Sequence, residues 1–165
     1  MDVKEVVSSV ESSKEYTDFI AENSDNYLVH LFTMMDVAHK DDWQLGYYSK
    51  KSDKITVFEN NQGKITILPA QEAFKEKNYI APLNIDNVKI AYVQAMDTIE
   101  DVLKKNYSAE SLVKAIVLLQ NLPEYGQIWN ITIVTMTFNV INVKINSSTG
   151  EVIKHSKETL IGWKK

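Results

Sequence analysis

The stretch WNITIVTMTFNVINVKINSSTGEVI, residues 129–153, holds the strongest structural signal in the sequence. It begins with a tryptophan, continues as strand-like runs, and then has a polar turn that ends in glycine before another strand begins. An earlier stretch, WQLGYYSKKSDKITVFENNQGKITI at residues 43–67, has the same order. Trp129 follows Trp43 by 86 residues (129 − 43), and Gly150 follows Gly63 by 87 (150 − 63). An offset this constant predicts an internal duplication.

The same two elements precede both stretches. Apolar residues at helical spacing predict an amphipathic helix over residues 3–22 in the first half and over 90–105 in the second. Short apolar runs follow at residues 27–37 and 112–122. We interpret both runs as buried strands, although periodicity alone would also allow a helix.

Each half therefore has one helix and four strands. The sequence predicts an α+β fold of two tandem units, each with one helix packed on a four-stranded antiparallel sheet, because one amphipathic helix can cover the apolar face of such a sheet. The units are residues 1–68 and 90–165, and residues 69–89 connect them with a short helical piece around residues 70–77. The two sheets either join edge to edge or pack separately.

Composition narrows the classes of function. The 165 residues are 44% hydrophobic and 24% charged, which is typical of a globular protein. There is no cysteine, which excludes disulfides, thiolate nucleophiles and cysteine-ligated metals. The net charge is −4 and all 18 basic residues are lysine. The absence of arginine, which an AT-rich genome would also explain, and the acidic balance argue against nucleic acid or a membrane as partner.

The ends and the hydropathy of the chain predict a cytoplasmic location. The N-terminal residues lack a basic start followed by an apolar core, which a secretory signal would have. No apolar run approaches the ~18 residues of a membrane span.

Few residues fit catalysis or metal binding. The best metal candidates are grouped in one region, but their spacing spreads them over a strand and a turn: His30, Asp36, His39, Asp41 and Asp42. His155 and Ser156 are neighbours on a strand and should point to opposite faces, so they do not form a catalytic pair. We therefore predict no catalytic residue, no metal and no cofactor.

The second half resembles a PepSY-like domain, a module found in peptidase propeptides. The resemblance rests on QAM at residues 94–96, Trp129, and VKINSSTGEVI at residues 143–153. Asn146 stands where the family usually has Asp, and the first half shares the pattern only through the repeat. The resemblance implies a cystatin-like helix-on-sheet fold without catalytic residues, and a role in binding peptides or inhibiting peptidases.

Four aromatic residues are the candidates for a binding surface. Tyr47 and Tyr48 are consecutive, so one of them should face outward from a strand and suit an interface. Trp43 and Trp129 fit core anchors, with ligand stacking as the alternative.

These observations favour a non-enzymatic protein or peptide binder of unknown pathway, either a monomer or a homodimer formed through a sheet edge. The alternatives are a small-molecule carrier with an apolar pocket between helix and sheet, and a hydrolase or metal enzyme that uses the region of His30 and His39.

Overall fold

The computed structural model describes residues 2–36, 42–73 and 80–160. It confirms the α+β class. The first half contains α1 (Val3–Glu11), α2 (Lys14–Glu22), β1 (Asn26–Met35), β2 (Asp42–Ser49), β3 (Lys54–Asn61), β4 (Lys64–Ile67) and β5 (Gln71–Glu72). After a 3-10 turn at Ile85–Asn87 come α3 (Tyr92–Asn106), β6 (Leu112–Leu122), β7 (Gly126–Thr135), β8 (Asn139–Asn146) and β9 (Val152–Thr159).

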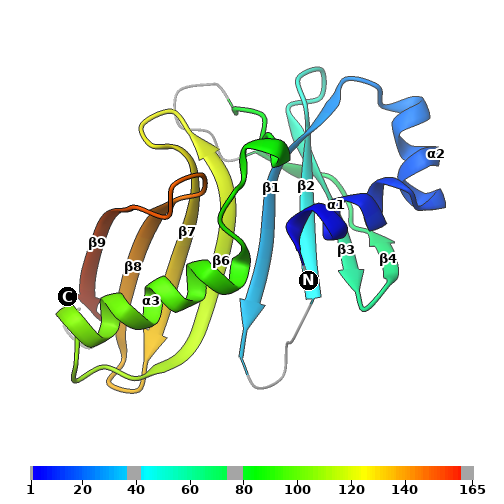
Figure 1. Cartoon of the computed structure of the whole chain (residues 1–165). Coiled ribbons are helices and arrows are strands. Elements are labelled where there is room, and N and C mark those ends of the chain that lie inside the picture. The colour runs from blue at the N-terminus through cyan, green and yellow to red at the C-terminus, as the bar shows by residue number, and fades with distance from the viewer. Residues whose placement is uncertain (1, 37–41, 74–79, 161–165) are drawn as a thin grey trace.

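All nine strands belong to one antiparallel sheet, with the order β4-β3-β2-β1-β6-β7-β8-β9 and with β5 paired to β3 (Figure 1). The sheet is therefore larger than the predicted four-stranded units, and edge-to-edge joining is the one of the two open arrangements that is found. β1 and β6 pair over six residues, from His30 opposite Gln120 to Met35 opposite Ala115. Each of these strands would otherwise expose an unpaired edge, and their pairing satisfies the backbone groups of both.

The helix expected over residues 3–22 is two helices. Ser12 is the C-cap of α1, and Ser13 is the N-cap of α2. The Ser13 side chain accepts a hydrogen bond from the backbone N–H of Tyr16 at 3.2 Å. Serine competes for backbone hydrogen bonds and favours helix caps, so two consecutive serines end one helix and begin the next.

The connection between the halves also differs from the prediction. Gln71 and Glu72, which fall in the expected helical piece, form β5, and residues 74–77 of that piece lie outside the described part of the chain. Further along, Leu83 and Val88 are buried, and the Leu83 N–H donates to the Leu28 carbonyl at 2.9 Å. The later part of the connection thus belongs to the hydrophobic core.

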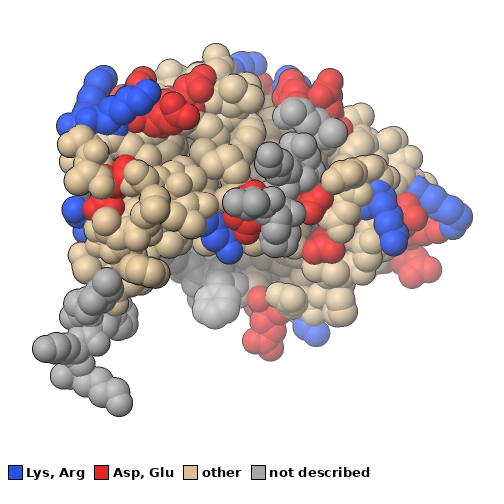
Figure 2. Space-filling model, turned by 90° about the horizontal axis from the view of Figure 1, so that it is seen from below, with Lys and Arg blue, Asp and Glu red and all other residues tan. Residues whose placement is uncertain are grey.

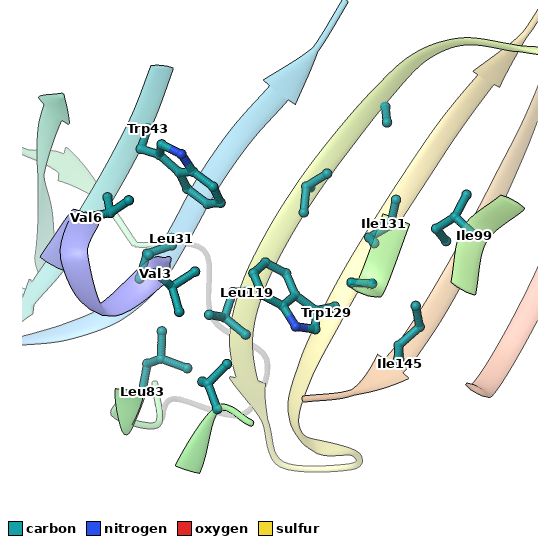
Figure 3. Close-up of a cluster of buried hydrophobic side chains, with 14 of the residues drawn as sticks. Val3, Val6, Leu31, Trp43, Leu83, Ile99, Leu119, Trp129, Ile131 and Ile145 are labelled. Carbon is teal, nitrogen blue, oxygen red and sulfur yellow. The ribbon is translucent and has the colours of Figure 1, made fainter. Parts of the chain in front are cut away.

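The helices cover one face of the sheet (Figure 1). α1 places Val3, Val6, Val7 and Val10 in a hydrophobic cluster that continues under α3 (Figure 3). Gly63 adopts a φ of 93° in the turn between β3 and β4, as its hairpin sequence predicts. No helix in the described ranges is both long and apolar enough to span a bilayer.

Candidate functional site

The two tyrosines predicted to include an exposed one are both buried. Tyr47 is 1% exposed on the helix-covered face, where its hydroxyl donates to Glu11 Oε1 at 3.0 Å. Burial raises the pKa of the Tyr47 hydroxyl. Tyr48 is 5% exposed and points the other way, against the Tyr27 ring at 5.6 Å. The prediction that Tyr47 and Tyr48 point to opposite faces of the sheet is correct. The predicted exposure of the outward tyrosine is wrong, because Tyr27 on the neighbouring strand covers Tyr48.

The two tryptophans lie in the core. Trp43 is 3% exposed and Trp129 is fully buried. Both indole rings contact the ring of Tyr92 from α3, with centroids 5.5 Å and 6.2 Å away respectively. The Trp129 indole N–H donates to the Ile90 carbonyl at 3.0 Å. They have the placement expected of core anchors, and neither offers an open face for stacking a ligand.

The metal candidates are only partly described, since His39 and Asp41 lie outside the described residues. His30 lies on the face opposite the helices, with its ring against Gly46 of β2, where an added Cβ would be 2.2 Å from the imidazole Cε1. Burial lowers the pKa of His30 to about 4. Within the described ranges, no three His, Cys, Asp or Glu side chains lie together as a metal site would require.

A cleft of about 360 Å³ lies between α3 and the edge strand β9. The spacing of its α3 residues places them on one flank of the helix. From β9, His155 points to the helix-covered face because it pairs with buried Val143. Apolar, polar and charged side chains line the cleft: Thr98, Asp101, Val102, Lys105, Asn106, Val152 and His155.

The His155 side chain is held at the cleft by Tyr107. The Tyr107 hydroxyl and His155 Nδ1 are 2.7 Å apart, and the two rings meet edge to face with centroids 5.5 Å apart. Lys157 Nζ lies 5.9 Å from the centre of the Tyr107 ring. Sequence reasoning considered His155 only as a partner of Ser156. It missed the cleft because the cleft depends on how α3 crosses the sheet, which no local pattern encodes.

The outer side of β9 is a sheet edge, since no strand among the described residues pairs with it there. Its residues after Val152 are exposed. The Leu160 N–H donates to the Phe138 carbonyl at 3.0 Å, which makes these two a hydrogen-bonded pair. Hydrogen-bonded and non-hydrogen-bonded pairs alternate along an antiparallel ladder, so the backbone N–H and C=O groups of His155, Lys157 and Thr159 point outward.

No protein-family model and no curated protein sequence matches the chain. A crystal structure from Clostridium difficile, described as a putative lipoprotein, has a similar fold. Its TM-score is 0.56 at 17% sequence identity, and the match covers 87% of this chain and 90% of that one. At this identity the likeness supports the fold and says nothing about the activity of this chain.

Proposed function

We propose that the protein is a non-enzymatic binder of an extended peptide or protein segment, which it takes up as an additional strand along β9. The observation behind this proposal is an exposed edge strand directly beside a cleft. The outward backbone groups of His155, Lys157 and Thr159 would form the main-chain hydrogen bonds. Side chains of the bound segment that face α3 would reach the cleft, which would provide selectivity.

β9 carries charges of both signs, since Lys154, Lys157 and Glu158 are exposed on it. Lys157 is paired with Glu110, with its Nζ 3.3 Å from Glu110 Oε1. A bound segment with an acidic residue opposite Lys154 would add a favourable cross-strand pair.

The finer proposal is that the chain consists of two PepSY-like halves with a cystatin-like fold. A protein of this kind would act by inhibiting a peptidase. The register of the sheet supports the duplication. Thr33 pairs with Trp43, and residues 86 positions later, Leu119 and Trp129, pair in the same way. At the junction of the halves, Phe32 pairs with Leu118, which is its own equivalent at that offset. The junction is thus centred on a pair of equivalent residues.

The test is selection from a library of extended peptides, followed by affinity measurement with variants at a single β9 position. His155→Pro removes the outward N–H and the side chain, whereas His155→Ala removes the side chain alone. We expect the Pro variant to bind at least about tenfold more weakly than the Ala variant, because one main-chain hydrogen bond is lost. Equal affinities of the two variants, or no enrichment of any peptide, would contradict the proposal.

A small-molecule carrier is the second candidate, and the volume of the cleft favours it. About 360 Å³ lies within the range of ligand pockets. The cleft lies at the flank of α3, since directly under the helix Ala95 and Ile99 are fully buried and fill the core. Native mass spectrometry of the purified protein distinguishes the two candidates, because a carrier would retain a small molecule that is lost on substituting Val102→Trp to fill the cleft.

A further inference from the structure

Exposed apolar side chains gather at one end of the second half. Of the seven large hydrophobic residues that are exposed in the described chain, four come from the start of β6, the β7–β8 turn and the end of β9. We call them the apolar tip: Val113 (51% exposed), Met136 (70%), Phe138 (61%) and Leu160 (51%).

Backbone hydrogen bonds join the segments that bear the apolar tip. The Met136 N–H donates to the Ser111 carbonyl at 3.0 Å, and the Leu160 N–H donates to the Phe138 carbonyl at 3.0 Å. The α3–β6 connection and the β7–β8 turn lie at the lower end of the molecule in Figure 1, and Thr159 at the end of β9 pairs with Asn139, just after that turn. Seen from below in Figure 2, the surface under the second half has an uncharged area that is bordered by Lys and by Asp or Glu side chains.

The turn that bears the tip is strained and braced. Phe138 has a φ of 59°, in the left-handed region that a bulky residue rarely adopts. Glu110 holds the turn in place, since its carboxylate accepts hydrogen bonds from Thr137 Oγ1, from Asn139 Nδ2 at 2.6 Å and from Lys157 Nζ at 3.3 Å. These donors lower the pKa of Glu110 to about 2, so the Glu110 carboxylate stays ionised at neutral pH. The fold therefore maintains a strained backbone that displays an aromatic side chain to solvent.

The size of the tip indicates what covers it. Four partly exposed side chains offer a few hundred Å² at most, well below the ~800 Å² that each partner contributes to a stable protein interface. An apolar tip of this size instead suits shallow insertion into a lipid surface, which requires no complementary shape.

Charges beside the tip fit the same occupant. Lys114 follows Val113 in β6, and Lys105 lies in the last turn of α3. The Glu110 carboxylate at the turn is balanced by Lys157, whose Nζ lies 3.3 Å from Glu110 Oε1, and Glu158 is an exposed acidic neighbour. Lysine attracts anionic headgroups, so Lys105 and Lys114 favour an anionic surface.

We propose that the apolar tip docks on an anionic lipid bilayer, with Met136 and Phe138 as the inserted side chains. The inference is independent of peptide binding at β9, and either can fail alone.

Vesicle co-sedimentation of the full chain tests the proposal, with phosphatidylcholine vesicles compared with vesicles that also contain phosphatidylserine. We expect binding to the mixed vesicles, and a loss of at least about tenfold in the Met136→Ser/Phe138→Asn variant. Asparagine tolerates the left-handed conformation, so this variant should keep the turn. The matched control is Ile67→Ser/Val93→Ser, which removes apolar side chains that are 40% and 63% exposed elsewhere, and it should bind like the unaltered protein.

Three results would overturn the proposal. The first is the absence of binding to both kinds of vesicle, which would leave the tip to a protein partner. The second is an equal loss in the tip variant and the control. The third is binding that salt abolishes but the tip substitutions do not change, because this would be electrostatic adsorption without insertion. Thermal melts of all variants establish that the fold is retained.

Discussion

The two halves of the molecule differ in the helices that cover their strands and in the side chains of their cores. In the first half, two nine-residue helices lie over a core that contains an aromatic cluster, in which Tyr16, Phe19 and Tyr47 each contact another ring with centroids 5.0 to 5.6 Å apart. In the second half, one 15-residue helix lies over a mainly aliphatic core. Its fully buried members include Ile99, Val117, Leu119, Ile131, Ile133, Ile141, Val143 and Ile145.

The difference predicts how strongly the stability of each half responds to substitution and to pH. Aromatic pairs depend on the relative orientation of the rings, whereas aliphatic side chains mainly need to fill volume. The first half also brings polar groups into its core, since Tyr47 donates to Glu11 and Asn60 Nδ2 donates to Ser9 Oγ at 2.7 Å. We therefore expect the first half to be the more sensitive to substitution and to pH, except at the tryptophans.

The largest effect should come from truncating the two tryptophans. We expect Trp129→Ala to lower the free energy of unfolding by about 4 kcal/mol, and Trp43→Ala by about 3 kcal/mol. The extra cost at Trp129 arises because it is fully buried and its loss leaves the Ile90 carbonyl without its indole donor. Urea denaturation measures both values, and a larger loss at Trp43 would contradict this comparison.

Acid should destabilise the first half through His30. Its folded pKa of about 4 lies below the ordinary 6.5, so the unfolded state binds the proton first as pH falls. Stability is fully present above pH ~6.5 and declines toward pH ~4, by roughly 2 to 3 kcal/mol. In the second half, the pair 86 positions later in the sequence, Ile116 and Thr132, has no ionisable group.

Unfolding measured between pH 7 and pH 4.5 in the unaltered protein and in His30→Gln checks this prediction. The slope over that window should be present in the first and largely absent in the second. Identical slopes would show that other groups cause the acid sensitivity.

Gly46→Ala should cost about 2 kcal/mol, because the new Cβ would overlap the His30 ring. The double variant with His30→Ala should recover most of that loss, since the ring is gone. A double-mutant cycle of unfolding free energies measures the coupling. Additive effects would mean that His30 moves aside without cost.

The smallest effect is at the helix caps. Ser13→Ala removes the side-chain cap of α2 and should cost about 1 kcal/mol. In α3 the corresponding contact is reversed, with Gln94 Oε1 accepting from the Ala91 N–H at 2.8 Å. Gln94→Ala should cost less, about 0.5 kcal/mol, because the exposed glutamine is more easily replaced by water. Thermal denaturation ranks the two variants.

The sequence allowed prediction of the features that depend on local pattern. These include the helix at α3, the strands that begin near Trp43 and Trp129, and the positive φ of Gly63. It did not reveal that β1 and β6 pair, since both read simply as buried strands. The burial of Tyr48 and the cleft beside His155 depend on neighbours brought in by tertiary structure. The break at Ser12–Ser13 was readable from capping preferences, but the apolar spacing obscured it.

The seam between β1 and β6 has a consequence for assembly. Phe32 and Leu118 lie near its middle, and among the described residues the seam joins the halves through backbone pairing and through the core above it. If the seam opened, β6 of one molecule could pair with β1 of another in the same register, and the second exchange would close a ring of two chains. A concentrated solution held under mildly unfolding conditions should therefore yield domain-swapped dimers, in which every strand retains its usual neighbours.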